Sequence, residues 1–171
     1  AHDRLRYTDE EYTLLIRSKT ASLLSGAAEC GALTAAPEIR QAMARFGDAL
    51  GMAFQIVDDL LDFTQPESVT GKPSGLDLRE HKVTLPLIAA LPQMTAAQRA
   101  SVDDLMATPS PSDDQIAAVV AGVTEAGGLA VARERAQHYA ERAEEELALL
   151  PASPARETLR ASLTYVLDRR R

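Results

Sequence analysis

The sequence predicts an all-α protein, and three of its features carry that prediction. Hydrophobic residues make up 46% of the 171 residues, but aromatic residues make up only 4%, whereas β-sheets favour aromatic and β-branched side chains. Alanine and leucine dominate the apolar positions, and residues that commonly start helices precede the apolar stretches. A chain of this length can bury one substantial core. We therefore expect residues 1–171 to form a single all-α domain.

Charge and cysteine content exclude several classes of function. The formal net charge of −7 argues against nonspecific nucleic-acid binding, which needs a basic surface. The single cysteine, Cys30, excludes an internal disulfide framework and fits a reducing compartment. No apolar run approaches the roughly 18–20 residues of a membrane-spanning helix, and no secretory signal opens the chain. We expect a cytoplasmic protein with no transmembrane segment and no nucleic-acid partner.

The first helix is expected over about residues 9–33. Thr8 can cap it, and acidic residues fill its first turn. Residues 18–32 are rich in Ser, Ala and Gly. Small side chains permit close approach of a neighbouring helix or leave space for a ligand, and packing is the preferred interpretation.

A second and longer helix is expected over about residues 37–63. Pro37 suits its first turn, and at 1.5 Å per residue it would be about 39 Å long. Gly47 and Gly51 lie inside it, and a glycine within a helix costs about 1 kcal/mol relative to alanine. Either close packing or room for a ligand would offset that cost.

A long loop is expected between residues 64 and 82, and loops of this length are often functional. It contains Lys72, Asp77 and Lys82. Lysine is a point-charge donor suited to phosphate oxygens, although exposed loops commonly contain lysines without any such role. After this loop, shorter helices are expected over about residues 84–91, 95–108, 112–127, 129–150 and 155–169.

The strongest chemical signal lies in residues 51–63. At 100° per residue, Gln55, Asp58, Asp59 and Asp62 fall within an arc of roughly 100° on one helix face. Apolar side chains cover the rest of the helix, which is typical of a buried helix. Unneutralised carboxylates in such a place would be costly. A hard divalent cation such as Mg²⁺, which commonly shares a phosphate ligand, is the usual remedy.

The alternative interpretation of these acids is a solvated face or an N-terminal acid cluster. Against it, the helix is expected to end near Phe63, so the acids lie close to its C-terminal end. The helix dipole makes negative charge unfavourable there. Placement against the dipole favours a ligand-binding role.

Two groups of residues resemble a known family. The order Phe54-Gln55-x-x-Asp58-Asp59-x-x-Asp62, then Gly71-Lys72, Asp77-Leu78 and Lys82-x-Thr84-x-Pro86, resembles the second aspartate-rich region of the trans-isoprenyl (polyprenyl) diphosphate synthases. Upstream, Lys19-Thr20-Ala21 is similar to the Lys-Thr-Ala motif of that family. Together these matches span about residues 17–86.

The resemblance implies an all-α helical bundle of the isoprenoid synthase type, with long helices around a central cavity. It also implies Mg²⁺ that bridges Asp58 to the allylic diphosphate, with Asp59 and Asp62 completing the metal cluster directly or through water. The resemblance further implies three lysines, Lys19, Lys72 and Lys82, that contact the diphosphate. Thr20 and Gln55 would lie beside the reacting allylic group. The implied reaction condenses that substrate with isopentenyl diphosphate and releases diphosphate.

One departure from the family pattern concerns the N-terminal part. The family carries an earlier aspartate-rich motif and basic residues for isopentenyl diphosphate, and nothing before Lys19 matches either. We therefore expect the C-terminal half of a longer synthase, with the N-terminal helices missing, that is inactive by itself. The resemblance also implies a homodimer. Product chain length cannot be read, because its determinants in the family lie largely around the missing motif.

Two other functions remain open from the sequence. A class I terpene cyclase shares the all-α class and an acidic motif, but Lys72 and Lys82 after the acids favour a synthase. A noncatalytic helical subunit of a prenyltransferase complex is the third possibility. Intact metal and lysine positions argue against it, since a purely structural subunit has no need of them.

Overall fold

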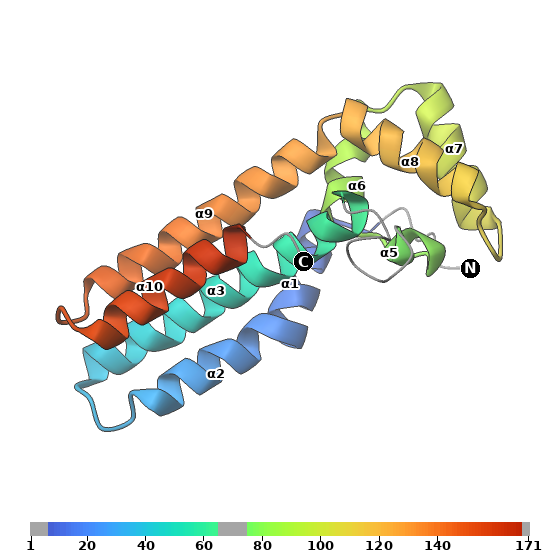
Figure 1. The fold of residues 1–171 in the computed structure, drawn as a ribbon. Coiled ribbons are helices and arrows are strands. Elements are labelled where there is room, and N and C mark those ends of the chain that lie inside the picture. Colours follow the sequence, from blue (N-terminus) through green and yellow to red (C-terminus); the bar gives the residue numbers. More distant parts are fainter. Residues whose placement is uncertain (1–6, 65–74, 169–171) are drawn as a thin grey trace. The chain divides into compact units, whose positions relative to one another are not determined.

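The structure is a computed structural model that describes residues 7–64 and 75–168, and within these residues it contains helices and no strand. This confirms the all-α prediction for the described part (Figure 1). The chain divides into two compact units. The first contains the described parts of residues 1–12 and 58–133, and the second contains residues 13–57 with the described part of 134–169. The single-domain prediction stays a prediction.

The first predicted helix is present, but it contains a wider turn. It comprises α1 (Asp9–Ile16), a π-helical segment η2 (Arg17–Ala21) and α2 (Ser22–Gly31). Thr8 caps α1 as expected: its Oγ1 accepts from the Glu11 N–H at 3.1 Å, and its own N–H donates to Glu11 Oε2 at 2.8 Å. This reciprocal pair is a capping box. The sequence pattern gave no indication of the π-helical segment.

The central helix is α3 (Pro37–Thr64), which confirms the predicted helix over 37–63. Its two glycines are sites of close packing. A Cβ on Gly51 would lie 2.5 Å from Ala21 Cα, and one on Gly47 would collide with the Leu24 carbonyl oxygen. At both glycines, backbone atoms of the preceding helical segment occupy the space that a side chain would need. Close packing, rather than room for a ligand, therefore offsets the cost of a glycine within the helix.

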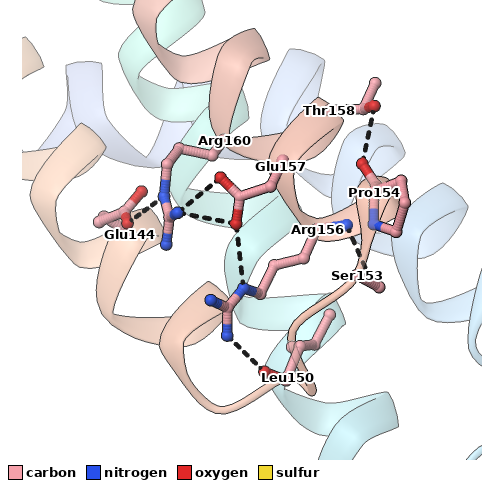
Figure 2. A network of polar contacts seen from close by, with 8 residues as sticks. All are labelled: Glu144, Leu150, Ser153, Pro154, Arg156, Glu157, Thr158 and Arg160. Atoms are coloured by element: carbon pink, nitrogen blue, oxygen red, sulfur yellow. Dashed lines mark hydrogen bonds and ion pairs between the residues drawn. The ribbon is translucent and has the colours of Figure 1, made fainter.

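The second unit has its core where α3 meets α9 (Gly128–Ala148) and α10 (Pro154–Leu167). The buried residues of this cluster are Phe46, Ala49, Ala143, Leu147 and Leu163. A polar network secures the turn between α9 and α10, as Figure 2 shows. Arg156 Nη1 donates to the Leu150 carbonyl at 2.8 Å, and Arg160 joins Glu144 on α9 to Glu157 on its own helix.

The first unit has a separate core, formed mainly by α6 (Leu85–Ala90), η3 (Leu91–Gln93), α7 (Ala96–Ala107) and α8 (Asp113–Glu125). Thr95 and Ser112 cap α7 and α8 with capping boxes, and both helices begin close to their predicted starts. The buried residues of this core are Phe63, Leu78, Leu87, Ala90, Met94, Val102, Leu105, Ile116, Val119 and Val123. Phe63 brings the end of α3 into this core.

The predicted loop over residues 64–82 needs a correction. A short helix, α5 (Leu76–Arg79), occupies part of it, and Leu78 is fully buried in the core of the first unit. Burial of Leu78 anchors these four residues as a helical turn. No sign of this turn is visible in the sequence, because most residues of the loop are polar. Residues 65–74, including Lys72, lie outside the described residues.

Within the described residues, no single helix is long and apolar enough to span a membrane. Helices α8 and α9 pass that test only as a pair, by length and composition, and they are bent at the break between them.

Candidate functional site

The acidic residues of α3 have very different surroundings. Asp58 is exposed, Asp59 is buried at 5% exposure, and Asp62 is half-buried. The sequence predicted that these carboxylates share one polar stripe inside an apolar body. The apolar body is present, since Ile56, Leu60 and Phe63 are buried. The correction is that Asp58 faces outward in this chain, so only Asp59 is fully enclosed.

Asp59 is held by a tyrosine that the sequence analysis missed. The Tyr12 hydroxyl donates to Asp59 Oδ2 at 2.6 Å, and Tyr12 is 2% exposed. Burial raises the pKa of the Tyr12 phenol, and the negative charge of Asp59 raises it further. The phenol therefore stays a neutral donor. Tyr12 and Ile16 are the buried positions of α1, four residues apart; helical spacing could have identified the burial but not the partner.

Asp62 holds the beginning of α5. Its Oδ1 accepts from the Leu76 N–H at 3.0 Å, its Oδ2 accepts from the Asp77 N–H at 3.1 Å, and its carbonyl accepts from the Gly75 N–H at 3.0 Å. Burial raises the pKa of the Asp62 carboxyl, and the two backbone hydrogen bonds oppose that shift. Both carboxylate oxygens of Asp62 therefore have backbone partners in the same chain.

Lys82 lies just beyond α5 and forms two ion pairs. Its Nζ lies 2.6 Å from Glu80 Oε2 and 3.2 Å from Asp77 Oδ1. The hydrogen bond to Glu80 is the largest cause of a raised pKa for the Lys82 ammonium. The side chain is half exposed, so it is cationic and open to solvent. The expected contact of Lys82 with a diphosphate stays a prediction.

The upstream motif lies in the second compact unit. Lys19 and Thr20 belong to the π-helical segment η2, and π-helical turns inside α-helices are frequent at functional sites. The Thr20 hydroxyl donates to Gln55 Oε1 at 2.8 Å. The structure therefore brings together Thr20 and Gln55, two residues that the family resemblance assigned to the same role. Lys19 is exposed on this segment.

A divalent cation fits this site only in one particular way. The described residues contain no group of three His, Cys, Asp or Glu side chains arranged to hold a metal ion, so an all-protein cage is absent from this part of the chain. Asp58 offers an exposed carboxylate, and hard oxygen ligands suit Mg²⁺. Mg²⁺ commonly binds through one or two carboxylates together with waters and substrate phosphates. The donor chemistry fits such a phosphate-sharing ion.

Fold and site together define an all-α protein in which an acidic helix motif accompanies cationic lysines, a combination suited to diphosphate chemistry. The chain belongs to the polyprenyl synthetase family, whose sequence profile matches residues 1–123. The matched range contains all the candidate site residues. The family predicted from the motifs is thereby confirmed.

Similar proteins carry names of prenyl diphosphate synthases, which include both short-chain and long-chain enzymes. An all-trans-nonaprenyl-diphosphate synthase (geranyl-diphosphate specific) of Rhodobacter capsulatus is 39% identical over 163 residues, which is 95% of this chain and 50% of that protein. An octaprenyl diphosphate synthase of Escherichia coli is 36% identical over 154 residues, covering 89% of this chain and 47% of the relative. The chain thus spans about half the length of the curated relatives it matches.

Solved structures of prenyl synthases also match nearly all of this chain and about half of their own length. A decaprenyl diphosphate synthase from Rhodobacter capsulatus matches with a TM-score of 0.88 at 38% identity, over 98% of this chain and 52% of that one. A polyprenyl synthase from Caulobacter crescentus, solved with calcium and isoprenyl diphosphate, matches with a TM-score of 0.89 at 30% identity, over 98% and 52% of the two chains. That relative therefore binds a divalent cation together with an isoprenyl diphosphate.

Proposed function

We propose that the protein carrying this sequence is a prenyltransferase, which condenses an allylic isoprenyl diphosphate with isopentenyl diphosphate and releases diphosphate. The observation that carries this proposal is the family match over residues 1–123, with the acidic motif of α3 intact inside it. The relatives named above, each about twice as long, support the same reaction class. Their names indicate long-chain products, but the product length of this protein stays open.

In the proposed reaction, the C–O bond of the allylic diphosphate breaks, and the C=C bond of isopentenyl diphosphate attacks the allylic cation. Loss of a proton from the adduct completes the condensation. When bound, Mg²⁺ supplies positive charge that stabilises the departing diphosphate. Asp58 would hold it through the exposed carboxylate on α3. The buried Asp59 accepts a hydrogen bond from Tyr12 through Oδ2, and it would contribute to the metal cluster directly or through water.

The lysines and the Thr20–Gln55 pair have separate proposed roles. Three lysines would bind diphosphate oxygens by charge: Lys19, Lys72 and Lys82. Of these, Lys19 and Lys82 lie in the described part, where both are exposed. The hydrogen bond between Thr20 and Gln55 fixes both side chains on neighbouring helices. We propose that they lie beside the reacting allylic group, where a fixed polar pair costs little reorganisation during ionisation.

The direct test is an elongation assay on the Asp58→Ala variant. The purified full-length protein that carries this sequence is incubated with farnesyl or geranyl diphosphate, isopentenyl diphosphate and Mg²⁺, and the chain length of the product is measured. Asp58 is exposed, so its replacement should leave helical content unchanged while elongation falls by orders of magnitude. Asp103→Ala, which removes an exposed carboxylate on α7, is the matched control and should retain full activity.

Near-normal elongation by Asp58→Ala would exclude the metal role. Conversion of the allylic diphosphate to a cyclic hydrocarbon without isopentenyl diphosphate would identify a terpene cyclase instead. We also propose that the protein works in the cytoplasm.

A homodimer is part of the proposal. Leu23 and Leu33 are 73% and 61% exposed on and just after α2, and Leu14 is 66% exposed on α1. Apolar side chains grouped on one helical segment favour association. A second copy of the chain is the proposed partner, as the family resemblance implies. Sedimentation of the wild type against Leu23→Glu tests it, since an unchanged dimer in the variant would place the interface elsewhere.

A further inference from the structure

Asp62 differs from the other two acids of α3 in how its oxygens are used. Each carboxylate oxygen accepts one backbone N–H from the first turn of α5, at 3.0 Å from Leu76 and 3.1 Å from Asp77. The carbonyl of the same residue accepts from Gly75 at 3.0 Å. Three successive N–H groups therefore converge on one residue, and a metal ion at Asp62 would have to share each carboxylate oxygen with a backbone N–H.

The segment that Asp62 holds is fixed on its other side as well. Leu78 is fully buried, and Gly75 has a left-handed backbone with φ of 69°. A Cβ on Gly75 would lie 2.5 Å from Ile116 Cγ2, so the turn before α5 sits against the core of the first unit. Burial of Leu78 and the hydrogen bonds to Asp62 together fix the position of α5 against the end of α3.

The same segment sets the position of Lys82. The Lys82 N–H donates to the Asp77 carbonyl at 2.8 Å, and Lys82 Nζ lies 3.2 Å from Asp77 Oδ1. Asp77 is thus bound by Asp62 through its N–H and binds Lys82 through its carbonyl and carboxylate. The path from Asp62 to Lys82 consists entirely of hydrogen bonds within one compact unit.

We infer that Asp62 is a positioning residue: it clamps the first turn of α5 to α3 and through Asp77 holds Lys82 in place, rather than acting as a metal ligand. Each oxygen accepts a backbone hydrogen bond without a cation, and charge-assisted acceptance from backbone N–H groups is among the stronger hydrogen-bonding arrangements. The role of Lys82 as a diphosphate contact rests on the proposed function. The positioning of α5 by Asp62 is independent of the proposed function.

The decisive measurement is amide hydrogen exchange without metal, in EDTA, on the purified protein. In Asp62→Ala the Leu76 and Asp77 amides should exchange about tenfold faster or more, as expected when a hydrogen bond to a charged acceptor is lost. In Asp62→Asn one oxygen remains an acceptor, so one of the two amides should keep its protection. The Leu105 amide in the buried part of α7 serves as reference for opening of the whole unit.

A second measurement separates the clamp from a metal role. Binding of Mg²⁺ in the presence of inorganic diphosphate, followed by calorimetry, should show an unchanged Mg²⁺ requirement in Asp62→Asn and a raised one in Asp58→Asn. If the protein elongates prenyl chains, Asp62→Asn should raise the KM for the allylic diphosphate severalfold, while the Mg²⁺ concentration giving half-maximal rate stays the same.

Two results would overturn the inference. One is unchanged protection of the Leu76 and Asp77 amides in Asp62→Ala with the Leu105 amide also unchanged. The other is an Mg²⁺ requirement that rises in Asp62→Asn as much as in Asp58→Asn. Failure of the full-length wild-type protein that carries this sequence to elongate any prenyl chain would refute the proposed function alone, and the exchange data would still decide the clamp.

Discussion

Gly51→Ala tests the packing that brings η2 against α3. The added Cβ would lie 2.5 Å from Ala21 Cα and 3.3 Å from Ala21 N. Carbon atoms pack best at about 3.5–4.0 Å, so the two helices must separate locally by about 1 Å or more. The colliding atoms belong to the backbone and cannot rotate away. Overpacking of this kind costs about 1–3 kcal/mol, and a backbone collision belongs near the upper end.

The substitution also has a stabilising effect, which reduces the net loss in the free energy of unfolding. Alanine is better than glycine within a helix by about 1 kcal/mol. The free energy of unfolding should therefore fall by about 2 kcal/mol in Gly51→Ala. For a chain of this size that corresponds to a melting temperature about 4–8 °C lower.

Gly26→Ala is the matched control on the neighbouring helix. No atom lies within 4 Å of a Cβ added to Gly26, which is exposed on α2. Only the propensity gain remains, so this variant should be more stable than the wild type by up to about 1 kcal/mol. Chemical denaturation of both variants measures the difference. Equal stability of Gly51→Ala and Gly26→Ala would refute the close packing of η2 on α3.

The remaining predictions concern the polar contacts of the first unit. Tyr12→Phe should lower the free energy of unfolding by about 2 kcal/mol, because it removes a buried hydrogen bond to the Asp59 carboxylate. Tyr7→Phe, which removes a longer hydroxyl contact to an exposed carbonyl, should change it by less than about 0.5 kcal/mol; equal losses in urea denaturation would contradict the Tyr12 contact. Glu80→Gln should lower the pKa of Lys82 in a side-chain NMR titration, since the hydrogen bond that Lys82 donates to Glu80 is the main cause of the raised pKa. Because that pKa is raised by folding, the pair stabilises the protein below the ordinary lysine pKa, and its contribution disappears as pH rises through the folded value; an unchanged titration would show that Glu80 is not the partner in solution.

The sequence by itself determined the helices and the chemical character of the site. Helix starts depend on local chemistry, so Thr8 could be recognised as a cap and the starts of α7 and α8 could be placed near residues 95 and 112. The acidic motif on α3 and the family were also readable, because residue types at helical spacing are visible in one dimension.

Only the tertiary structure decided which partner each acid has. Tyr12 and Asp59 lie 47 positions apart, and the Asp62 contacts span 14 and 15 positions. A periodic pattern shows which face of a helix is buried, but it does not show which distant group arrives there. The helical turn α5 was missed for the same reason. Leu78 is buried in a core with residues from segments far apart in the chain, such as Phe63 and Ile116, and this burial outweighs the weak local preferences of four residues. The π-helical segment η2 has no signal in the sequence pattern.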